Sequence, residues 1–326
     1  MSSFKYNNVY IKDYDTIAGP QEKEGNLTYP HTIDDYYYNE ERIEDAEIKM
    51  QNTCLTNIIK RNKLNNHIEL VVGGDLLNQI SITSYNLVNR NIPFLGIYNA
   101  CATFNEALII LSNMINQGSI NSGLAITSSH NLNAERQYRF PIEYGSPKKN
   151  YTTFTTTGAA CALITREPTN IRIESATIGT VVDYGIKDAN NMGAIMAPSA
   201  AETLHNHLIE LHRNIDYYDV IITGDLGKLG SELFLKLIKT EYKYTPKYYL
   251  DAASVIYKEE QKTFQGGSGP VVIPLVLFNK LLKDKKNKKI LLLATGSLHS
   301  PLMVNLKKSI PAITHAVSIE VIEWYI

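Results

Sequence analysis

The stretch FLGIYNACATFNEALIILSNMI, residues 94–115, predicts the arrangement on which the rest of the chain depends. Phe94 to Tyr98 is a short apolar run of the kind found in a buried strand. After Cys101 the apolar residues recur at helical spacing, and Gly118 follows as a C-cap, which predicts a buried helix. Cys101 is therefore expected at a helix N-terminus, where the backbone N–H groups lower the pKa of a thiol or hold a carboxylate. This stretch alone does not distinguish a reactive thiol from a site that binds a carboxylate.

Length and composition narrow the class of protein. The 326 residues exceed the roughly 250–300 at which single cores stop growing, and the net charge of −1 does not favour general binding to nucleic acid. Cys54, Cys101 and Cys161 lie far apart with no CxxC pair, so we expect no disulfide framework, no metal site and no cofactor. No apolar run could span a membrane, and the first residues lack the apolar segment of a signal peptide. We expect a soluble intracellular protein that reaches a membrane only through partners.

Two short patterns occur twice in the chain. VVGGDLL (71–77) resembles VIITGDLG (220–227), and each leads a strand-like run into Gly-Asp-Leu. AITSSH (125–130) resembles ATGSLH (294–299), with Ala, Ser and His at matching places. The recurrence indicates an internal duplication.

The duplication predicts an α/β fold of two pseudo-symmetric halves with a largely buried sheet. The spacing of the second repeat pairs Cys101 with Pro270, and proline is favoured at the first position of a helix. We expect a polar, loop-like N-terminal extension over 1–39 packed on the fold, a first half over 40–180 and a second half over 181–326. The patterns predict helices at 40–60, 78–90, 199–212, 230–240 and 271–283, and strands at 67–75, 123–130, 158–165, 171–179, 219–227, 289–299 and 313–324.

A duplicated α/β half with a cysteine at the start of a buried helix resembles the thiolase superfamily, including the ketoacyl-carrier-protein synthase III group. ACATFNEAL (100–108) is similar to the nucleophile segment, and TTTGAACALI (155–164) to a glycine-rich strand of those enzymes. The resemblance implies an α-β-α-β-α layered fold in which a His and an Asn of the second half stabilise a thioester oxyanion. The corresponding positions hold Gly224 or Asp225 and Gly267. An Asp beside the sulfur would raise the thiol pKa, so we do not expect the usual condensation.

A second resemblance covers nearly the whole chain. The segments that carry it are GPQEKEGNL (19–27), GGDLLNQ (73–79), TSSHNLNAERQYRFPIEYG (127–145), DYGIKDANNMGAIMAP (183–198) and TGDLGKLGS (223–231). They are similar to the stage V sporulation protein AD family of endospore-forming bacteria. This resemblance implies a protein that binds dipicolinic acid, free or as its calcium chelate, and serves its uptake into the developing spore without turnover. It also implies membrane-embedded SpoVA partners at the inner spore membrane, and the superfamily habit suggests a homodimer.

A site for dipicolinate, a flat ring with two carboxylates, needs apolar walls and a few cationic or N–H donors. Two repeated histidines end equivalent strands, two arginines follow the first of them, and a Gly-rich turn precedes the second helix. The candidate ligand-binding residues are Cys101, His130, Arg136, Arg139, Asp225, Gly267, Ser268 and His299.

Structural roles for the same residues remain open. The histidines could cap their strands, the arginines could pair with Glu135 or Glu143, and Asp75 and Asp225 are favoured as turn formers that accept backbone N–H bonds. Cys101 could be a buried hydrophobe that lines the pocket, a vestige of a nucleophile.

Two functional alternatives and two surface features complete the sequence-based hypotheses. Cys101 with His130 or His299 could serve acyl transfer or condensation, or the fold could be a scaffold for protein partners. His205, His207 and His212 are expected on a solvated helix surface rather than around a metal, because residues two apart on a helix do not share a face. The basic run KDKKNKK (283–289) is expected to be a solvated helix end, with a partner or an anionic-lipid patch as alternatives.

Overall fold

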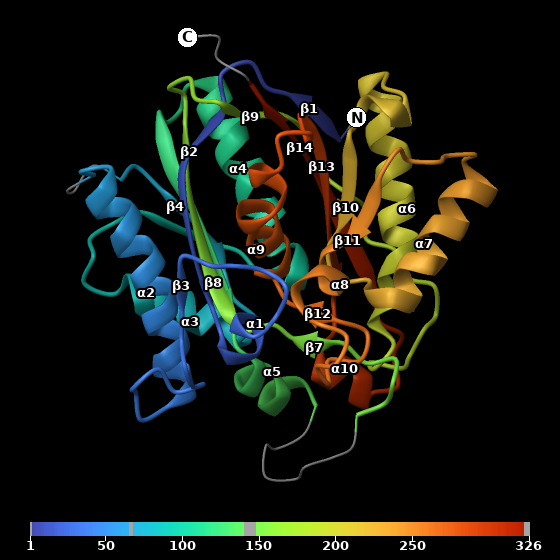
Figure 1. Cartoon of the computed structure of the whole chain (residues 1–326), viewed down its shortest axis with the longest axis horizontal. Coiled ribbons are helices and arrows are strands. Elements are labelled where there is room, and N and C mark those ends of the chain that lie inside the picture. Colours follow the sequence, from blue (N-terminus) through green and yellow to red (C-terminus); the bar gives the residue numbers. More distant parts are fainter. Residues whose placement is uncertain (1, 65–67, 140–147, 323–326) are drawn as a thin grey trace.

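The computed structural model describes residues 2–64, 68–139 and 148–322. Its centre is a twelve-stranded sheet that contains two sets of five strands, joined where Tyr10 lies opposite Arg172 (Figure 1). The first set, in spatial order, is β5 (Phe94–Gly96), β4 (Val71–Gly74), β6 (Ser122–Ser129), β8 (Gly158–Thr165) and β2 (Tyr10–Ala18). The second set is β11 (Tyr249–Asp251), β10 (Val220–Thr223), β13 (Lys289–Ser297), β14 (Ala312–Val321) and β9 (Ile171–Thr177).

The two sets have the same topology. In each set the first two strand pairs are parallel and the last two are antiparallel. The repeated sequences fall on equivalent strands, with the Gly-Asp pattern at the ends of β4 and β10 and the Ala-Ser-His pattern on β6 and β13. The prediction of two pseudo-symmetric α/β halves is therefore confirmed. Short strands complete the structure: β1 (Ser3–Lys5) and β3 (His31–Thr32) extend the main sheet, while β7 (Phe154–Thr155) pairs with β12 (Gly267–Ser268).

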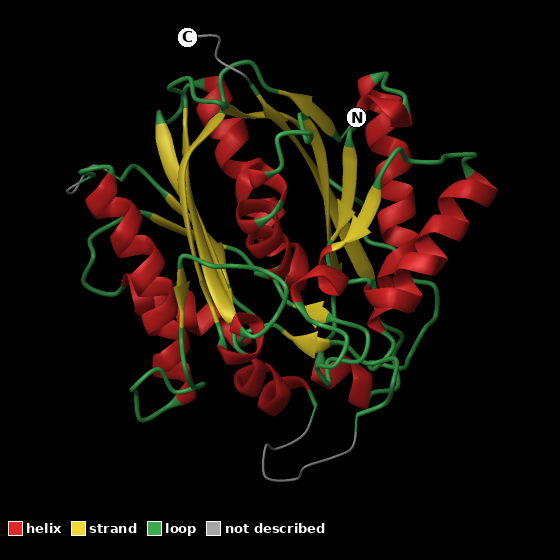
Figure 2. Cartoon of the chain, viewed as in Figure 1, coloured by secondary structure: helices red, strands yellow, loops and turns green. Residues whose placement is uncertain are grey.

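Helices form three layers around the two sets of strands, which gives the expected α-β-α-β-α order (Figure 2). The outer layers are α2 (Ile43–Arg61) with α3 (Ser81–Leu87), and α6 (Met192–Leu211) with α7 (Gly227–Glu241). The central layer is α4 (Thr103–Gln117) and α9 (Val272–Asn279). Short helices lie near the lower edge of Figure 1 or beside the strands: α1 (Pro20–Lys23), α5 (Asn131–Tyr138), α8 (Ala252–Ile256) and α10 (Pro301–Asn305).

The central helices show why the opening stretch organises the fold. On α4 the side chains of Phe104, Leu108 and Leu111 are fully buried, because this helix contacts both sets of strands. Burial of each such side chain contributes about 1.5–3 kcal/mol. Gly118 ends α4 with φ +82°, so the predicted C-cap is confirmed. Every residue of α9 is also buried, as its unbroken apolar sequence requires.

Several predicted elements need correction. The strand expected to be buried at 94–98 is an edge strand, β5, and Leu95 is 43% exposed because only one neighbour covers it. The loop expected within 1–39 contains β2, which pairs along its length with β8. The boundaries at 39/40 and 180/181 stay predictions, although β2 joins the first set of strands and β9 the second. Two short elements, β11 and α8, were not predicted because they carry too few residues for a periodic signal.

No helix in the described part of the chain combines the length and the apolar character needed to cross a membrane.

Candidate functional site

Cys101 lies in a single 3-10 turn, Ala100–Ala102, between the edge strand β5 and the central helix α4. The predicted position at the start of the buried helix is therefore confirmed. Ala100 has φ +48°, a left-handed conformation that costs a non-glycine residue about 1 kcal/mol or more and that recurs at binding and catalytic sites. The Cys101 side chain is almost buried, and its Sγ lies 3.7 Å from the Ser268 Oγ of the second half.

The surroundings of Cys101 keep its thiol protonated. Burial, followed by the nearby Asp225 carboxyl group, raises the thiol pKa well above its ordinary value. The Ser268 hydroxyl and the Gly269 N–H act in the opposite direction but do not offset this. The helix N-terminus favours a lower thiol pKa, but burial and Asp225 outweigh it, in agreement with the effect expected of an Asp beside the sulfur.

Asp225 links the strand end of β10 to the Gly-rich turn. Its carboxyl group is buried and accepts a hydrogen bond of 2.8 Å from the Gly269 N–H. Burial, with the Asp251 carboxyl group, raises the pKa of Asp225 well above its ordinary range. The Gly-rich turn thus binds a carboxyl group as expected, but that group belongs to the chain itself. Asp75, the repeated counterpart, accepts bonds from the Leu77 and Thr83 N–H groups, as predicted for a turn former.

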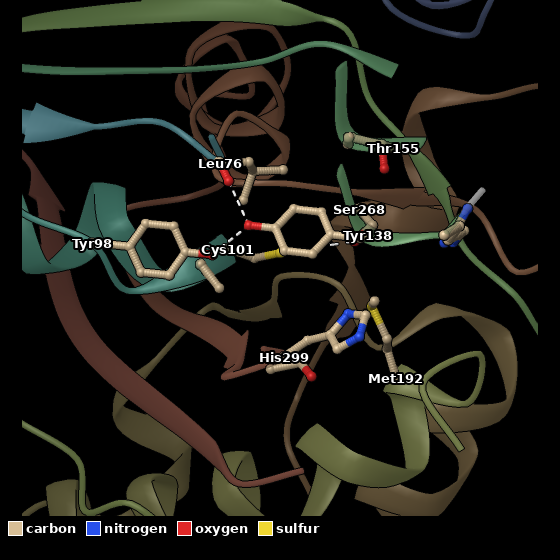
Figure 3. A pocket seen from close by; sticks show the side chains of 12 residues that line it. Leu76, Tyr98, Cys101, Tyr138, Thr155, Met192, Ser268 and His299 are labelled. Carbon is tan, nitrogen blue, oxygen red and sulfur yellow. Dashed lines mark hydrogen bonds between the residues drawn. The ribbon is translucent and has the colours of Figure 1, made fainter. Parts of the chain in front are cut away.

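A cavity of about 40 Å³ opens beside Cys101, and residues of both halves line it (Figure 3). The first half contributes Leu76, Tyr98, Cys101, Tyr138, Arg139 and Thr155. The second half contributes Met192, Ser268, Ser297 and His299. The walls are mainly apolar, with a few polar groups directed inward, as is usual for a small-molecule site.

Two polar groups of this cavity lack hydrogen-bond partners among the described residues, and a third lining residue, Arg139, is charged. The Ser297 Oγ and the His299 Nδ1 are buried and have no hydrogen-bond partner among the described residues. Burial and the positive charge of Arg139 lower the pKa of His299, so its ring is neutral at pH 7. Arg139 donates to the Thr153 carbonyl at 3.0 Å and pairs with Glu135, the partner expected from the sequence. Buried polar groups normally have a hydrogen-bond partner, so the Ser297 Oγ and the His299 Nδ1 are suited to bind a ligand or water.

Tyr138 occupies most of the space between these groups. Its hydroxyl donates to the Leu76 carbonyl and pairs with the Tyr98 hydroxyl, as Figure 3 shows. Its ring lies 5.4 Å from the His299 ring, with 35° between the two planes. The remaining volume holds only a few water molecules. A ring of aromatic size would therefore have to replace the Tyr138 side chain.

The structure does not bring all the predicted residues to this cavity. His130, a candidate ligand-binding residue, is buried outside this cavity, where its Nε2 bonds to the Tyr36 carbonyl at 2.8 Å. The physical reason is that His130 precedes α5 and packs against Tyr36, whereas the later residues Tyr138 and Arg139 reach the cavity. Arg136 points to the outer surface and pairs with Glu44, a partner that the sequence did not suggest. Glu143, the other proposed partner, lies outside the described residues.

The Gly-rich turn divides its roles between adjacent residues. Ser268 lines the cavity, whereas Gly267 packs beneath it, with the Thr156 Oγ1 only 2.6 Å from where a Cβ would stand. Sequence reasoning missed Ser297 and Tyr138. Ser297 lies in the repeated Ala-Ser-His pattern and could have been found from it, but nothing in the sequence placed Tyr138 against His299.

The histidines of α6 need a second correction. His207, expected at a solvated surface, is fully buried between the Thr177 and Tyr218 hydroxyl groups. His205 stacks on Tyr242 at 4.2 Å. No cluster of three or more metal-binding side chains occurs among residues 2–64, 68–139 and 148–322.

Comparison with solved structures identifies the fold. A variant of OleA from Xanthomonas campestris matches with a TM-score of 0.64 and 15% identity, over 97% of this chain and 99% of that one. OleA from the same organism with bound lauric acid and lauroyl-CoA matches with a TM-score of 0.62 and 16% identity, over 96% and 99%. A tetronic acid condensing enzyme, AbyA1, gives 0.58 and 13%, over 96% and 99%. The fold is thiolase-like, like that of OleA and the condensing enzymes, as predicted.

Comparison with known sequences identifies the family. The family model for stage V sporulation protein AD matches residues 2–320. The stage V sporulation protein AD of Bacillus subtilis (strain 168) is 37% identical over 318 residues, which cover 96% of this chain and 94% of that protein. The chain therefore belongs to the stage V sporulation protein AD family.

Proposed function

We propose that this protein binds dipicolinate in the cavity beside Cys101, without chemical turnover, and serves the uptake of dipicolinate into the developing spore. The observation that carries the proposal is that the buried Ser297 Oγ and His299 Nδ1 lack partners among the described residues and lie with the Arg139 cation in a mainly apolar cavity. A flat dicarboxylate matches that set, because it offers an aromatic face to the walls and acceptors to the donors.

The charge at the rim favours an anion. Among the residues that the structure describes, Arg139 and Lys148 both pair with the Glu135 carboxylate, Lys148 at 2.8 Å, so two described cations share one anion. Arg139 lines the cavity, so a second carboxylate of the ligand would reach its guanidinium group. An arginine that is largely shielded from water is suited to a bidentate contact with a carboxylate.

Tyr138 indicates where the ligand ring would bind. An aromatic ring already lies over His299 in the observed form. Dipicolinate has an aromatic ring of similar size, so it would take this place once the Tyr138 side chain turns out. The hydrogen bonds of Tyr138 to Leu76 and Tyr98 are the contacts that binding would have to exchange.

Three features argue against acyl transfer as the main function. The Cys101 thiol is kept protonated by burial and by Asp225, whereas a nucleophile needs a lowered pKa or an adjacent base. Asp225 has a structural role, because its carboxyl group accepts the hydrogen bond from the Gly269 N–H of the Gly-rich turn. The segments that would supply the oxyanion donors present Gly224 and Gly267.

The partners implied by the family resemblance belong to the same proposal. We propose that the protein works with the membrane-embedded SpoVA proteins at the inner spore membrane and forms a homodimer. The exposed edge of β5 and the segment that follows it, where Leu95 and Tyr98 are 43% and 45% exposed, offer a surface for a second copy. The equivalent edge strand β11 has Leu250 buried and offers no such surface.

Titration calorimetry with dipicolinate tests the proposal. We expect saturable binding to the unmodified protein and a loss of at least about tenfold in affinity for Arg139→Ala, since a charge-assisted contact contributes about 1.5–3 kcal/mol. Arg136→Ala is the matched control, because Arg136 lies three residues earlier and outside the cavity. Absence of binding, or equal weakening by both substitutions, would refute binding in this cavity.

Acyl transfer remains the second candidate, because Cys101 does occupy the start of the buried helix in a fold shared with OleA and the condensing enzymes. Incubation with an acyl-CoA separates the two functions. The proposal expects no acyl adduct on Cys101 by mass spectrometry, whereas an adduct lost in Cys101→Ala would favour the enzyme.

A further inference from the structure

A groove lined by lysines lies at the end of the fold opposite the Cys101 cavity. It has a volume of about 540 Å³, and Lys247, Lys280 and Lys286 line it together with Tyr248. Lys283, the last residue of the 3-10 turn Leu281–Lys283, and Lys285 do not line the groove themselves but lie on the same exposed run of chain before β13. We refer to these five lysines and Tyr248 as the basic groove.

The lysines of the basic groove outnumber the carboxylates that line it. In the described part of the chain none of its five lysines forms an ion pair. Two acidic residues, Asp219 and Asp284, also line the groove. Asp219 accepts bonds from the N–H groups of Lys288 and Lys289 at 2.9 Å, and Asp284 accepts from the Lys286 N–H at 3.0 Å. Both carboxylates thus organise the backbone, while the ammonium groups remain available.

The kind of cation indicates the kind of partner. Arginines elsewhere in the chain, such as Arg61, Arg139 and Arg213, form ion pairs with specific carboxylates. The basic groove contains only lysines, whose compact and strongly hydrated ammonium groups attract a charged surface without fixed geometry. Tyr248 is 55% exposed next to Lys247, and tyrosine is enriched where proteins meet the headgroup region of a membrane. This combination fits a lipid surface better than a peptide carboxylate.

The position of the groove leaves the cavity free. Strand β13 begins at Lys289 beside the groove and ends at Ser297 in the cavity, as its direction in Figure 1 shows. A strand of this length spans roughly 30 Å at about 3.3 Å per residue. Electrostatic attraction is screened over about 8–10 Å at physiological salt, so lipid charge at the groove would not act on the cavity.

We propose that the basic groove docks the protein directly onto an anionic phospholipid surface. The attraction comes from the five ammonium groups and is therefore weakened by salt, while Tyr248 inserts its ring at the headgroup level. This inference is independent of dipicolinate binding and of any membrane-protein partner, because none of the groove residues lines the Cys101 cavity.

Vesicle flotation with the full chain tests the docking. We expect the protein to float with vesicles of phosphatidylglycerol and phosphatidylcholine in equal parts at about 0.05 M salt, and to be released at about 0.5 M salt. The triple substitution Lys283→Gln, Lys285→Gln and Lys286→Gln should weaken vesicle binding by about tenfold or more. Vesicles of phosphatidylcholine alone should not bind the protein.

A second triple variant controls for net charge. Lys228→Gln, Lys258→Gln and Lys262→Gln remove three exposed lysines at other places, and it should float like the unmodified protein. Circular dichroism checks that both variants are folded.

Equal flotation of both triple variants, binding to neutral vesicles, or no binding to anionic vesicles would overturn the proposal. Salt-sensitive binding to polyglutamate without binding to vesicles would also overturn it, and would assign the groove to an acidic protein segment. Dipicolinate calorimetry on the first triple variant should match that of the unmodified protein, so a failure of this inference is distinguishable from a failure of the proposed function.

Discussion

The two repeated histidines occupy equivalent strand ends but have different surroundings. His130 follows β6, is buried at the start of α5 and bonds through Nε2 to the Tyr36 carbonyl. His299 follows β13, lines the Cys101 cavity and leaves its Nδ1 without a partner among the described residues. The strand framework is repeated, whereas the segments that cover the strand ends are not, so one histidine became structural and the other is available to a ligand.

The same difference applies to the two Gly-Asp turns. Gly74 lies so close to the next strand end that a Cβ would be 2.0 Å from the Ile97 carbonyl oxygen, a backbone atom. At Gly224 a Cβ would be 3.3 Å from its nearest neighbour, on Thr295. The Gly-Asp turn of the first half is therefore tightly packed, and that of the second half more loosely.

The largest expected effect comes from alanine at these two glycines. Gly74→Ala should lower the free energy of unfolding by about 3 kcal/mol or more, because a backbone clash cannot be relieved by a side-chain rotation. Gly224→Ala should cost less than about 1 kcal/mol. Urea unfolding measures both, and equal losses would contradict the difference in packing.

The two histidines should separate stability from binding. His130→Ala should destabilise the fold by about 1–3 kcal/mol, because it leaves the Tyr36 carbonyl without its donor and opens a cavity, but should not change dipicolinate affinity. His299→Ala should weaken dipicolinate binding by about tenfold with little loss of stability. Calorimetry and thermal unfolding of both variants would refute the comparison if the effects were reversed or the same.

Buried carboxyl groups in the two halves predict a pH dependence. Burial, with the Asp75 charge, raises the pKa of Glu47 to about 8, and burial raises that of Asp251 to about 7. A carboxyl group whose pKa is raised by folding stabilises the protein fully below its unfolded pKa, near 4, and this contribution is lost as pH rises through the folded value. Burial lowers the pKa values of histidines such as His130 and His315 to about 4. These groups make stability rise with pH, but only up to their unfolded pKa near 6.5.

Stability should therefore fall between pH 6.5 and pH 8, by about 2–3 kcal/mol. Glu47→Gln should flatten the decline between pH 7 and pH 8, whereas Asp251→Asn should affect chiefly the part below pH 7. Thermal unfolding across this range measures the slopes. A rise in stability over the range, or no effect of Glu47→Gln, would contradict the assignment.

The smallest expected effect is at Cys101. Because its thiol is protonated, iodoacetamide should modify it at pH 7 no faster than it modifies the buried Cys54 and Cys161. Mass spectrometry of the digested protein gives the three rates. Selective modification of Cys101 would indicate an activated nucleophile.

Most of the fold was predictable because long elements carry a periodic signal. The stripe of α2 and the strand–helix unit around Cys101 follow from apolar spacing, and the duplication follows from the Gly-Asp and Ala-Ser-His repeats. Strand β2 was missed since its polar, tyrosine-rich sequence resembles a loop, although Ile11 and Ile17 are fully buried. Its identity as a strand depends on β8, a contact far away in sequence.

The site was predictable only in part. The meeting of Cys101, Asp225 and Ser268 was predictable, because the resemblance to the thiolase superfamily identifies which segments meet. Arg139 and Arg136 could not be separated, because their directions depend on the orientation of α5, and Tyr138 could not be placed at all. Such loop and helix-end geometry is set by tertiary packing rather than by local sequence.

The central claim is that dipicolinate binds beside Cys101 in place of the Tyr138 ring. A crystal structure of the full chain with dipicolinate tests it most directly. We predict ligand density stacked on His299, a carboxylate within hydrogen-bond distance of Arg139, and Tyr138 turned out of the cavity. Dipicolinate at another place, with Tyr138 still over His299, would contradict the claim.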